Sequence, residues 1–518
     1  MPSKNFILEN STSQLVLEKI TDIYALNKIT EQKCKYIFYD TFDWRLYFNK
    51  VFFYLEGTKA CLDGNSIDFT ENAVEAATFK DKKFWWDLPQ SDLREYLRKI
   101  VDVRALLKIL SLDIIRCDFE VLNEERKIIA KISVLNIVSR SISSYSTFII
   151  KLVPVKGYKN ESKPIVDILR KYSSKLKIDY GYWGLIFKKS GIKPVVYSTK
   201  PDRKSLGLKA SDEFHKDQAT YVAIKNLLLF ILEVLRKNIP GIVKDIDTEF
   251  LHDFRVLIRR TRSSLTQLEN VFTDEITATY RDLFAKISNS TNKARDLDVF
   301  IITLISLKEK IPQHLTDGLG QIFDYLYEEK SVQYKKLKNL LTRQHFKNVL
   351  INWEIFLKDT DIKYAAEMGY KLVNETARYF IFKSLNKVSK KYNILLSGNT
   401  PVNMHQLRIS CKKLRYVLEL FNIFYNNNIY TKVLDHLKAL QDASGLYQDL
   451  EVQKNMLIEI LNELKKCNKI NEEISLTAGY IFRIFEEKQR QIPANFIDLY
   501  NNFEITIKSK KFKRILEE

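Results

Sequence analysis

The sequence predicts a mostly helical protein whose amino-terminal part is an α+β domain. Two observations separate these parts. Short runs rich in Ile, Val, Phe and Tyr, separated by polar turn residues, fill the first 200 residues. From about residue 213 onward, apolar residues instead recur at the spacing of a helix. With 518 residues and 45% hydrophobic content, the chain can bury the cores of two or three domains.

Four amino-terminal segments have the composition of β-strands and are bounded by Asp, Asn, Gly or Ser. They are Lys35–Tyr39, Lys50–Leu55, Lys127–Val134 and Thr147–Val155. Between and after them, helical periodicity predicts helices over Asp92–Ile100 and Pro164–Leu176. We therefore expect residues 1–200 to form an α+β domain with a mainly antiparallel sheet.

A polar segment punctuated by proline and glycine separates the two parts and predicts a linker over residues 201–214. The helical region follows it. Two helix starts are marked by capping residues there. Asp247 or Thr248 can cap one helix, and Thr400 followed by Pro401 is a good cap and first-turn pair for another.

The helices that follow these caps repeat one pattern of histidine and cations, 153 positions apart. The offsets are 0, +3, +7, +8 and +10, and all but the +8 position fall within an arc of roughly 80° on a helix that turns about 100° per residue. The members are His252, Arg255, Arg259, Arg260 and Arg262, and then His405, Arg408, Lys412, Lys413 and Arg415. Each helix is predicted to carry one basic stripe.

The opposite face of each helix is apolar and is expected to pack. Its residues are Phe254, Ile258, Leu265 and Leu268 in the first copy, and Leu407, Cys411, Leu414, Leu418 and Phe421 in the second. A single charge run is usually a solvated helix face, and that interpretation stays open. However, like charges three or four residues apart cost an isolated helix roughly 0.2–0.5 kcal/mol per pair. Because this repulsion occurs twice, we expect a bound polyanion to offset it.

The offset of 153 extends beyond the stripes. It aligns residues 295–299 (RDLDV) with residues 448–452 (QDLEV), and Lys237 with Lys390. This indicates an internal duplication of about 150 residues. The aligned acids could be metal ligands, but because they follow basic helices we expect them to form ion pairs that orient Arg or Lys. Arg295, Lys237 and Lys390 are additional candidates for the basic lining.

Composition agrees with an anionic ligand. The chain has 83 Lys+Arg against 64 Asp+Glu and a net charge of +19, although its general richness in lysine supplies part of that charge.

The five cysteines lack CxxC spacing and are expected to stay reduced. The six histidines are dispersed, and His215, His314, His345 and His436 lack ligand-spaced partners, so no metal site is expected. Neither a signal peptide nor a membrane span is indicated, and we expect a cytoplasmic protein.

The two basic segments also carry a family resemblance. LHDFRVLIRRTRSSL and MHQLRISCKKLRYVLELF, followed by DLDV and DLEV, resemble the two halves of a CHAD domain, the conserved-histidine α-helical domain. The resemblance covers residues 215–510, with repeats at about 215–360 and 361–510. It implies a pair of antiparallel four-helix bundles related by a pseudo-twofold axis, with the basic helices lining a central channel. It also implies inorganic polyphosphate as the ligand and association with polyphosphate granules.

The amino-terminal domain resembles the CYTH fold, the triphosphate-tunnel domain, in YDTFDWRL, WDLPQSDLREYLRKIVDVRALLKI and IIKLVPVKGY. Active members have a Glu-x-Glu-x-Lys strand whose paired carboxylates hold a metal. The corresponding residues 6–11 offer only Glu9, and one carboxylate cannot hold a divalent ion. We therefore expect a CYTH-like scaffold without catalysis. Arg45, Lys131 and Lys151 are candidate cations inside a tunnel, with a structural role as the alternative.

These observations together predict a module that binds inorganic polyphosphate in a basic channel, as an accessory or targeting protein without catalytic residues or cofactors. Direct contacts are expected from Arg255, Arg259, Arg262, Arg408, Lys412 and Arg415, because arginine can fork two donors onto one phosphate and lysine supplies a mobile charge. His252 and His405 either donate to phosphate or lock helix packing.

Two alternatives stay open. The first is metal-dependent hydrolysis of triphosphate or polyphosphate by the CYTH-like domain, which the missing carboxylate pair disfavours. The second is non-specific nucleic-acid binding. Few aromatic residues on which bases could stack interleave with the stripes, and Tyr416 is the nearest exception. The oligomeric state, the preferred chain length and any ligand of the amino-terminal domain are left open by the sequence.

Overall fold

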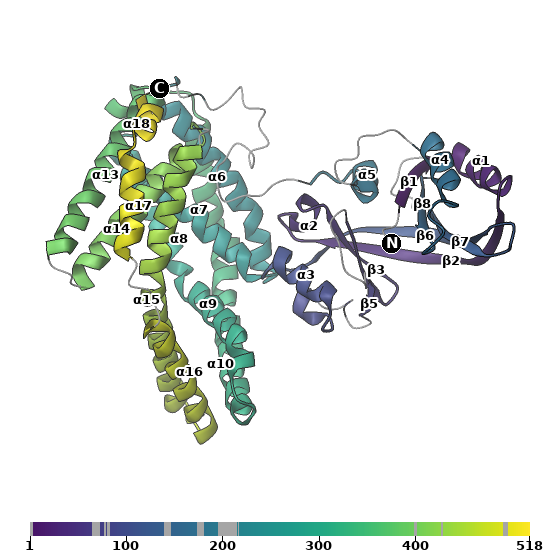
Figure 1. Cartoon of the computed structure of the whole chain (residues 1–518). Coiled ribbons are helices and arrows are strands. Elements are labelled where there is room, and N and C mark those ends of the chain that lie inside the picture. The colour runs from purple at the N-terminus through teal and green to yellow at the C-terminus, as the bar shows by residue number, and fades with distance from the viewer. Residues whose placement is uncertain are drawn as a thin grey trace. The chain divides into compact units, whose positions relative to one another are not determined.

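The structure is a computed structural model of the 518-residue chain (Figure 1). It describes residues 4–64, 73–76, 79, 83–138, 147–173, 181–194, 215, 217–397, 401–425, 428–490 and 496–517. The chain divides into two compact units, Met1–Tyr197 and Ser198–Glu518. Residues 201–214, for which the sequence predicts a linker, lie outside the described residues.

The first unit is built on one eight-stranded sheet with the order β1-β8-β7-β6-β2-β3-β4-β5, in which every pair is antiparallel. The strands are β1 (Lys4–Glu9), β2 (Ala25–Asp40), β3 (Val51–Glu56), β4 (Lys59–Gly64), β5 (Ala73–Glu75), β6 (Leu107–Leu122), β7 (Ile128–Ile137) and β8 (Thr147–Pro154). The four predicted strands coincide with parts of β2, β3, β7 and β8. The predicted antiparallel α+β architecture is confirmed.

Both faces of this sheet are covered, since alternate side chains of a strand point to opposite faces. Helices α1 (Asn10–Thr21) and α4 (Lys163–Tyr172) bury apolar residues against β1, β7 and β8. Helix α3 (Asp92–Val101), which matches a predicted helix, packs near β3 and β4. On the other face, α5 (Gly181–Lys189) inserts Trp183 and Phe187 among the aromatic residues of β2 and β3.

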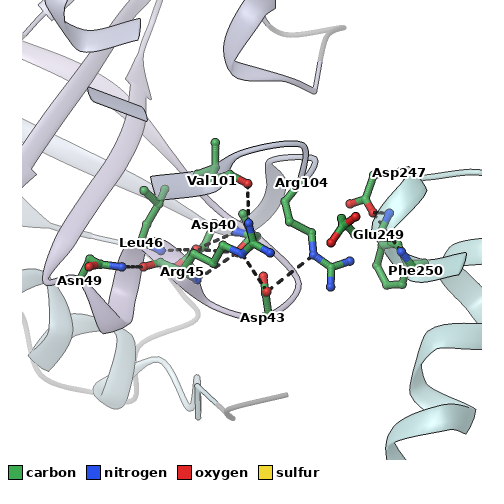
Figure 2. A network of polar contacts seen from close by, with 11 residues as sticks. Asp40, Asp43, Arg45, Leu46, Asn49, Val101, Arg104, Asp247, Glu249 and Phe250 are labelled. Carbon is green, nitrogen blue, oxygen red and sulfur yellow. Dashed lines mark hydrogen bonds and ion pairs between the residues drawn. The ribbon is translucent and has the colours of Figure 1, made fainter. Parts of the chain in front are cut away.

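A buried carboxylate shapes the turn after β2. Asp40 accepts hydrogen bonds from the backbone N–H groups of Thr41, Leu46 and Tyr47 at 2.7, 3.0 and 2.9 Å. Burial raises the pKa of Asp40 to about 7, although these three donors favour its ionised form. The carboxylate thereby fixes the start of the short helix α2 (Arg45–Phe48) (Figure 2).

Arg45 belongs to this turn and not to a strand. Its Nε donates to Asp43 at 2.9 Å and its Nη1 donates to the carbonyl of Val101 at 2.9 Å. The buried Arg104 places its Nε 3.6 Å from the same Asp43 carboxylate (Figure 2). The expectation that strand alternation could aim Arg45 into a tunnel is therefore wrong, because Arg45 lies in α2 and holds two loops together.

The second unit is helical, as the sequence predicts. Its helices are α6 (Thr220–Val243), α7 (Thr248–Gln267), α8 (Asp274–Ser290), α9 (Asn292–Leu307), α10 (Thr316–Thr342), α11 (Gln344–Lys358), α12 (Glu367–Tyr370), α13 (Val373–Ser397), α14 (Pro401–Phe421), α15 (Asn428–Lys466), α16 (Glu472–Arg490), α17 (Phe496–Lys508) and α18 (Lys510–Glu517). Helices α6 and α13 begin 153 positions apart, and so do α7 and α14.

The predicted cap of α7 is present. The Asp247 carboxylate accepts hydrogen bonds from the backbone N–H groups of Glu249 and Phe250 at 3.0 and 3.2 Å, as an N-cap residue does. Helix α14 begins at Pro401, where proline needs no hydrogen bond. Thr400, its predicted cap, lies outside the described residues.

Helices from both halves of this unit share one core. Apolar residues of α9 and α10 pack with those of α15 and α16 in a single buried cluster that includes Phe300, Ile322, Leu457 and Phe485. Figure 1 shows these four helices running together away from α6, α7, α13 and α14. The halves therefore interlock and are not two independent bundles.

Gly318 tests this interlocking. A Cβ added there would lie 2.3 Å from both the carbonyl oxygen of Glu473 and the Oγ1 of Thr477, on α16. We expect Gly318→Ala to destabilise the helical unit by about 1–3 kcal/mol, because neither helix can yield without losing contacts. Gly320→Ala is the control, since nothing lies within 4 Å of its Cβ. Unfolding in urea, followed by helical circular dichroism, checks this; equal stability of the two variants would contradict the close α10–α16 packing.

Candidate anion-binding site

The two predicted basic stripes lie on α7 and α14, which contact each other. Their predicted apolar faces are buried: Phe254 and Ile258 of α7, and Leu414 and Leu418 of α14, are fully enclosed. Burying these faces leaves the opposite side of each helix to the cations. We use the term stripe cluster for Arg255, Arg259, Arg262, Arg408, Lys412 and Arg415.

Arg259 and Lys412 bring the two stripes together. Burial lowers the pKa of Lys412, and the positive charges of Arg408, Arg259 and Arg415 lower it further, against an opposing effect of Asp449. Lys412 is thus repelled by cations of its own helix, α14, and by a cation of α7. Arg259 is exposed and makes no ion pair within the described part of the chain. Mutual repulsion between the stripes is built into the folded protein.

Arg255 and Arg408 also hold neighbouring helices. The Nη1 of Arg255 donates to the carbonyl of Ser288 at 3.1 Å and to the Oδ1 of Asn292 at 2.8 Å, at the junction of α8 and α9. The Nη2 of Arg408 lies 3.7 Å from the Asp449 carboxylate on α15. These two arginines are therefore fixed in place, and only part of each guanidinium remains for a ligand.

Three arginines of the stripe cluster have a buried donor without a hydrogen-bond acceptor. The Nε atoms of Arg262, Arg408 and Arg415 are all inaccessible to solvent and lack an acceptor in the described structure. The Nε of Arg415 has only an ion pair with Glu419, at 3.5 Å. A buried charged donor without an acceptor costs about 1–3 kcal/mol or more. Because these atoms are closed to solvent, a ligand would meet the outer Nη groups of these arginines and not the Nε atoms.

The two residues at the +8 position of the pattern do not join the stripe cluster. Arg260 is nearly buried, and its Nη2 donates to Glu419 at 2.9 Å. Burial lowers the pKa of Arg260, and the Glu419 carboxylate opposes that effect. Lys413 is exposed and faces a separate groove beside α13. The sequence pattern sets the +8 position apart from the arc of the other cations, and the structure gives this position another role in each copy.

Tyr416 lies among the cations. The guanidinium carbons of Arg259 and Arg415 are 5.7 and 5.6 Å from the centroid of its ring, within the range of cation–π contacts. This ring therefore helps to hold one arginine of each helix at the place where α7 and α14 meet.

The two histidines lie in different surroundings. His252 is half-buried, whereas His405 is exposed. Within the described residues, His252 forms a group with Glu249 and Asp253 whose ligand atoms all lie within 4.8 Å of one another. The acids at −3 and +1 from His252 lie outside the repeated pattern, which runs from the histidine to the cations three to ten positions later, so the pattern does not reveal this group.

The three residues proposed as additions to the basic lining lie at different places in the helical unit. The Nη1 of Arg295 donates to the carbonyl of Thr248 at 3.3 Å, at the start of α7. Lys237 forms an i,i+4 ion pair with Glu233 on α6. Lys390 is exposed and lines the same groove as Lys413. Arg295 therefore contacts a stripe helix directly.

Three of the acids that follow the stripes form ion pairs, as expected: Asp449 with Arg408, as described above, and also Asp298 and Glu451. Asp298 is completely buried; Lys330 lies 3.2 Å from its carboxylate and the Tyr334 hydroxyl donates to it at 2.6 Å. Glu451 pairs with Lys454 on the same helix. Burial raises the pKa of Asp298, and the Lys330 charge partly offsets this. These carboxylates thus stabilise the fold around cations.

Similarity to known proteins was found for the helical unit. One solved structure is the CHAD domain from the plant Ricinus communis, at 20% identity and a TM-score of 0.47, covering 57% of this chain and 96% of that one. Another is PptA from Streptomyces chartreusis, at 10% identity and a TM-score of 0.40, covering 56% of this chain and 100% of that one. No curated protein matches the chain.

Among the described residues, no helix is both long and apolar enough to cross a membrane.

The model of the CHAD domain family matches residues 227–457. This range contains both stripe helices, so the resemblance seen in the sequence is confirmed for the region that holds the stripe cluster. Residues 227–457 of this chain are a CHAD domain.

Proposed function

We propose that the stripe cluster binds inorganic polyphosphate and that the protein serves as an accessory or targeting module. One observation carries this proposal. Cations of two helices converge at Lys412, whose pKa is lowered by the charges of Arg408, Arg259 and Arg415 against the single opposing acid Asp449. A chain of phosphates would supply the missing negative charge.

The arrangement suits a linear polyanion better than a single phosphate. The cluster draws Arg259 and Arg262 from α7 and Lys412 and Arg415 from α14, so its cations extend along two helices. A ligand with about one charge at each repeating unit can contact all of them in turn. Arginine gives directed pairs of donors, and lysine adds a charge that adapts to the ligand.

Nucleic acid is the second candidate, and the aromatic content of the site disfavours it. Base stacking needs accessible aromatic faces between the cations. Tyr416, the aromatic residue of the cluster, is half-buried and already contacts Arg259 and Arg415. A phosphodiester chain could still bind through its backbone. Competition between polyphosphate and nucleic acid for the site distinguishes the two ligands.

Hydrolysis by the amino-terminal unit has less support. On its sheet, Arg116 lies 3.1 Å from Glu56 and 3.0 Å from Asp118. Asp118 also accepts hydrogen bonds from Ser133 and Thr30, at 2.5 and 3.0 Å. These carboxylates are already engaged with protein donors. This supports a CYTH-like scaffold without catalysis.

The remaining cations proposed for a tunnel are also near acids. Lys131 lies 3.6 Å from Glu120 on the neighbouring strand. Burial raises the pKa of Asp63, and the charge of Lys151 offsets part of this rise. Such compensation is typical of a stable sheet face, and it leaves less positive charge for a triphosphate.

Competition at fixed ionic strength tests the proposed function. Labelled long-chain polyphosphate should be displaced by unlabelled polyphosphate at far lower concentration than by single-stranded DNA or RNA. If about six cations contact the chain, the plot of log affinity against log salt should have a slope of roughly −4, by analogy with single-stranded nucleic acid. Equal displacement by all polymers would refute selectivity for polyphosphate, and release of phosphate from triphosphate with added metal would refute the non-enzymatic role.

A further inference from the structure

A groove of about 500 Å³ lies between α13, α14 and the carboxyl-terminal end of α7. Five lysines line it, together with one acid, Glu269: Lys383, Lys387, Lys390, Lys391 and Lys413. Its volume is within the range of about 300–1,000 Å³ that is usual for small-molecule sites. The groove is therefore large enough for a ligand of several charged groups.

Most of these lysines are not neutralised. Lys383 pairs with Glu269, and the Nζ of Lys391 donates to the neutral Gln406 at 2.6 Å. Lys387 and the other two lysines are exposed and have no acidic partner in the described part of the chain. One carboxylate against five ammonium groups leaves a strong excess of positive charge in a concave site, where it attracts anions.

This groove is distinct from the stripe cluster, although both use α14. The groove residues of α14 are Gln406, Ile409, Ser410 and Lys413, whose spacing of three and four defines one face of the helix. The stripe residues of α14 occupy positions 408, 412 and 415. On a helix that turns about 100° per residue, these sets are centred on different faces.

The corresponding place in the first half of the unit has no such groove. Shifting by 153 positions replaces Lys383, Ser384 and Lys387 of α13 with apolar residues of α6: Phe230, Ile231 and Val234. The pocket found there, which Ile231 lines, has a volume of only about 20 Å³. Helix packing of this type therefore does not require lysines at these positions.

The small pocket and the lysine groove also differ in how their charges are balanced. Lys413 corresponds to Arg260, and Thr266 corresponds to Glu419, again at an offset of 153. In the small pocket, Glu419 neutralises Arg260 at 2.9 Å. In the groove, Thr266 stands where the small pocket has Glu419. No acid of the described residues therefore neutralises the charge of Lys413. One half has closed this place with an ion pair, whereas the other has left it open and basic.

We propose that this lysine groove is a second binding site, specific to the second half of the CHAD domain, for a condensed phosphate with several charges. The site does not depend on the stripe cluster for its charge. Its donors are flexible ammonium groups with the hydroxyls and amides of Thr266, Ser410 and Gln406, which suit phosphate oxygens. The ligand is either a free oligophosphate or a segment of a longer polyphosphate.

Tripolyphosphate is a suitable probe for calorimetric titration of the full chain. To remove the contribution of the stripe cluster, Arg259→Ala and Lys412→Ala are introduced first. The binding that remains should weaken about a hundredfold when Lys383→Gln and Lys387→Gln are added, since each of the two lost charge-assisted contacts costs about tenfold in affinity. The matched control adds Lys335→Gln and Lys338→Gln, which remove two exposed lysines of α10, and should leave it unchanged.

The outcomes separate this proposal from the proposed function. Loss of tripolyphosphate binding on removal of the groove lysines supports the second site even if the stripe variants bind polyphosphate normally, a result that would sink the proposed function alone. No residual binding in the stripe variant, or no response to the groove lysines, overturns the second site. Long-chain polyphosphate that is unaffected by the groove variants identifies a free oligophosphate as the ligand; a parallel loss identifies a segment of the longer chain.

A measurement on the unaltered protein guards against misfolding of the variants. Bound tripolyphosphate should protect Lys387 and Lys413 from acetylation, as read by mass spectrometry, relative to Lys335 and Lys338. Protection by an acidic peptide such as polyglutamate, without protection by tripolyphosphate, would overturn the assignment of phosphate as the ligand.

Discussion

Replacing Arg259 and Lys412 together with alanine should weaken the binding of long-chain polyphosphate by about a hundredfold or more. Hydrogen bonds to charged groups are worth about 1.5–3 kcal/mol each, and each 1.4 kcal/mol is tenfold in affinity. Both residues lie where the two stripes meet, and the charge of Arg259 contributes to lowering the pKa of Lys412. Binding is measured by displacement of labelled polyphosphate at one fixed salt concentration.

The salt dependence provides an independent readout of the same variant. Loss of two phosphate contacts should make the slope of log affinity against log salt shallower by about 1.4. The control, Lys335→Ala with Lys338→Ala, changes the net charge equally on exposed positions of α10 and should leave the slope in place. If both variants weaken binding alike, net charge explains the binding and the stripe cluster does not.

Arg259 and Lys412 are better targets than Arg255 and Arg408. The latter pair contacts the Ser288 carbonyl and the Asp449 carboxylate, so their replacement would remove helix contacts and ligand contacts together. Arg259 forms no hydrogen bond or ion pair in the described part of the chain, although its guanidinium contacts the Tyr416 ring, so its replacement removes fewer contacts between helices. Arg259→Ala and Lys412→Ala as single changes should weaken binding comparably, and indifference to one of them would contradict a site shared by the two helices.

Glu419→Ala should destabilise the helical unit by about 3–5 kcal/mol. Its carboxylate forms an ion pair with the nearly buried Arg260 at 2.9 Å and lies 3.5 Å from the Nε of Arg415. Arginine stays charged at any ordinary pH, so the variant would retain an uncompensated cation in a dry environment. Removing one partner of a buried ion pair typically costs this amount. The midpoint of urea unfolding, followed by helical circular dichroism, measures it.

Two further variants separate burial from charge. Glu233→Ala removes an acid whose pair with Lys237 is largely exposed, and should cost no more than about 1 kcal/mol. Arg260→Met with Glu419→Leu removes both charges and should recover most of the stability lost by Glu419→Ala. A Glu419→Ala protein as stable as Glu233→Ala would show that water or another group reaches Arg260.

The sequence determined the local structure of this protein. Helical periodicity defined α7 and α14, because the buried positions of a packed helix must recur every three or four residues, and Phe254, Ile258 and Leu414 are indeed enclosed. Asp247 could be identified as a cap because a cap acts on N–H groups only two or three residues away. Strand composition likewise located β3 and β7, since alternation and branched side chains are local features.

The tertiary structure alone decided which charges are free. Arg260 and Lys413 are equivalent in the sequence pattern, yet one meets Glu419, which is 159 positions away, and the other faces an open groove. Periodicity assigns a side chain to a face of its helix but not to a partner, because that partner comes from a distant segment brought close by packing. The shared core of α9, α10, α15 and α16 has the same origin. The pairing of charged side chains therefore depends on contacts that no local pattern specifies.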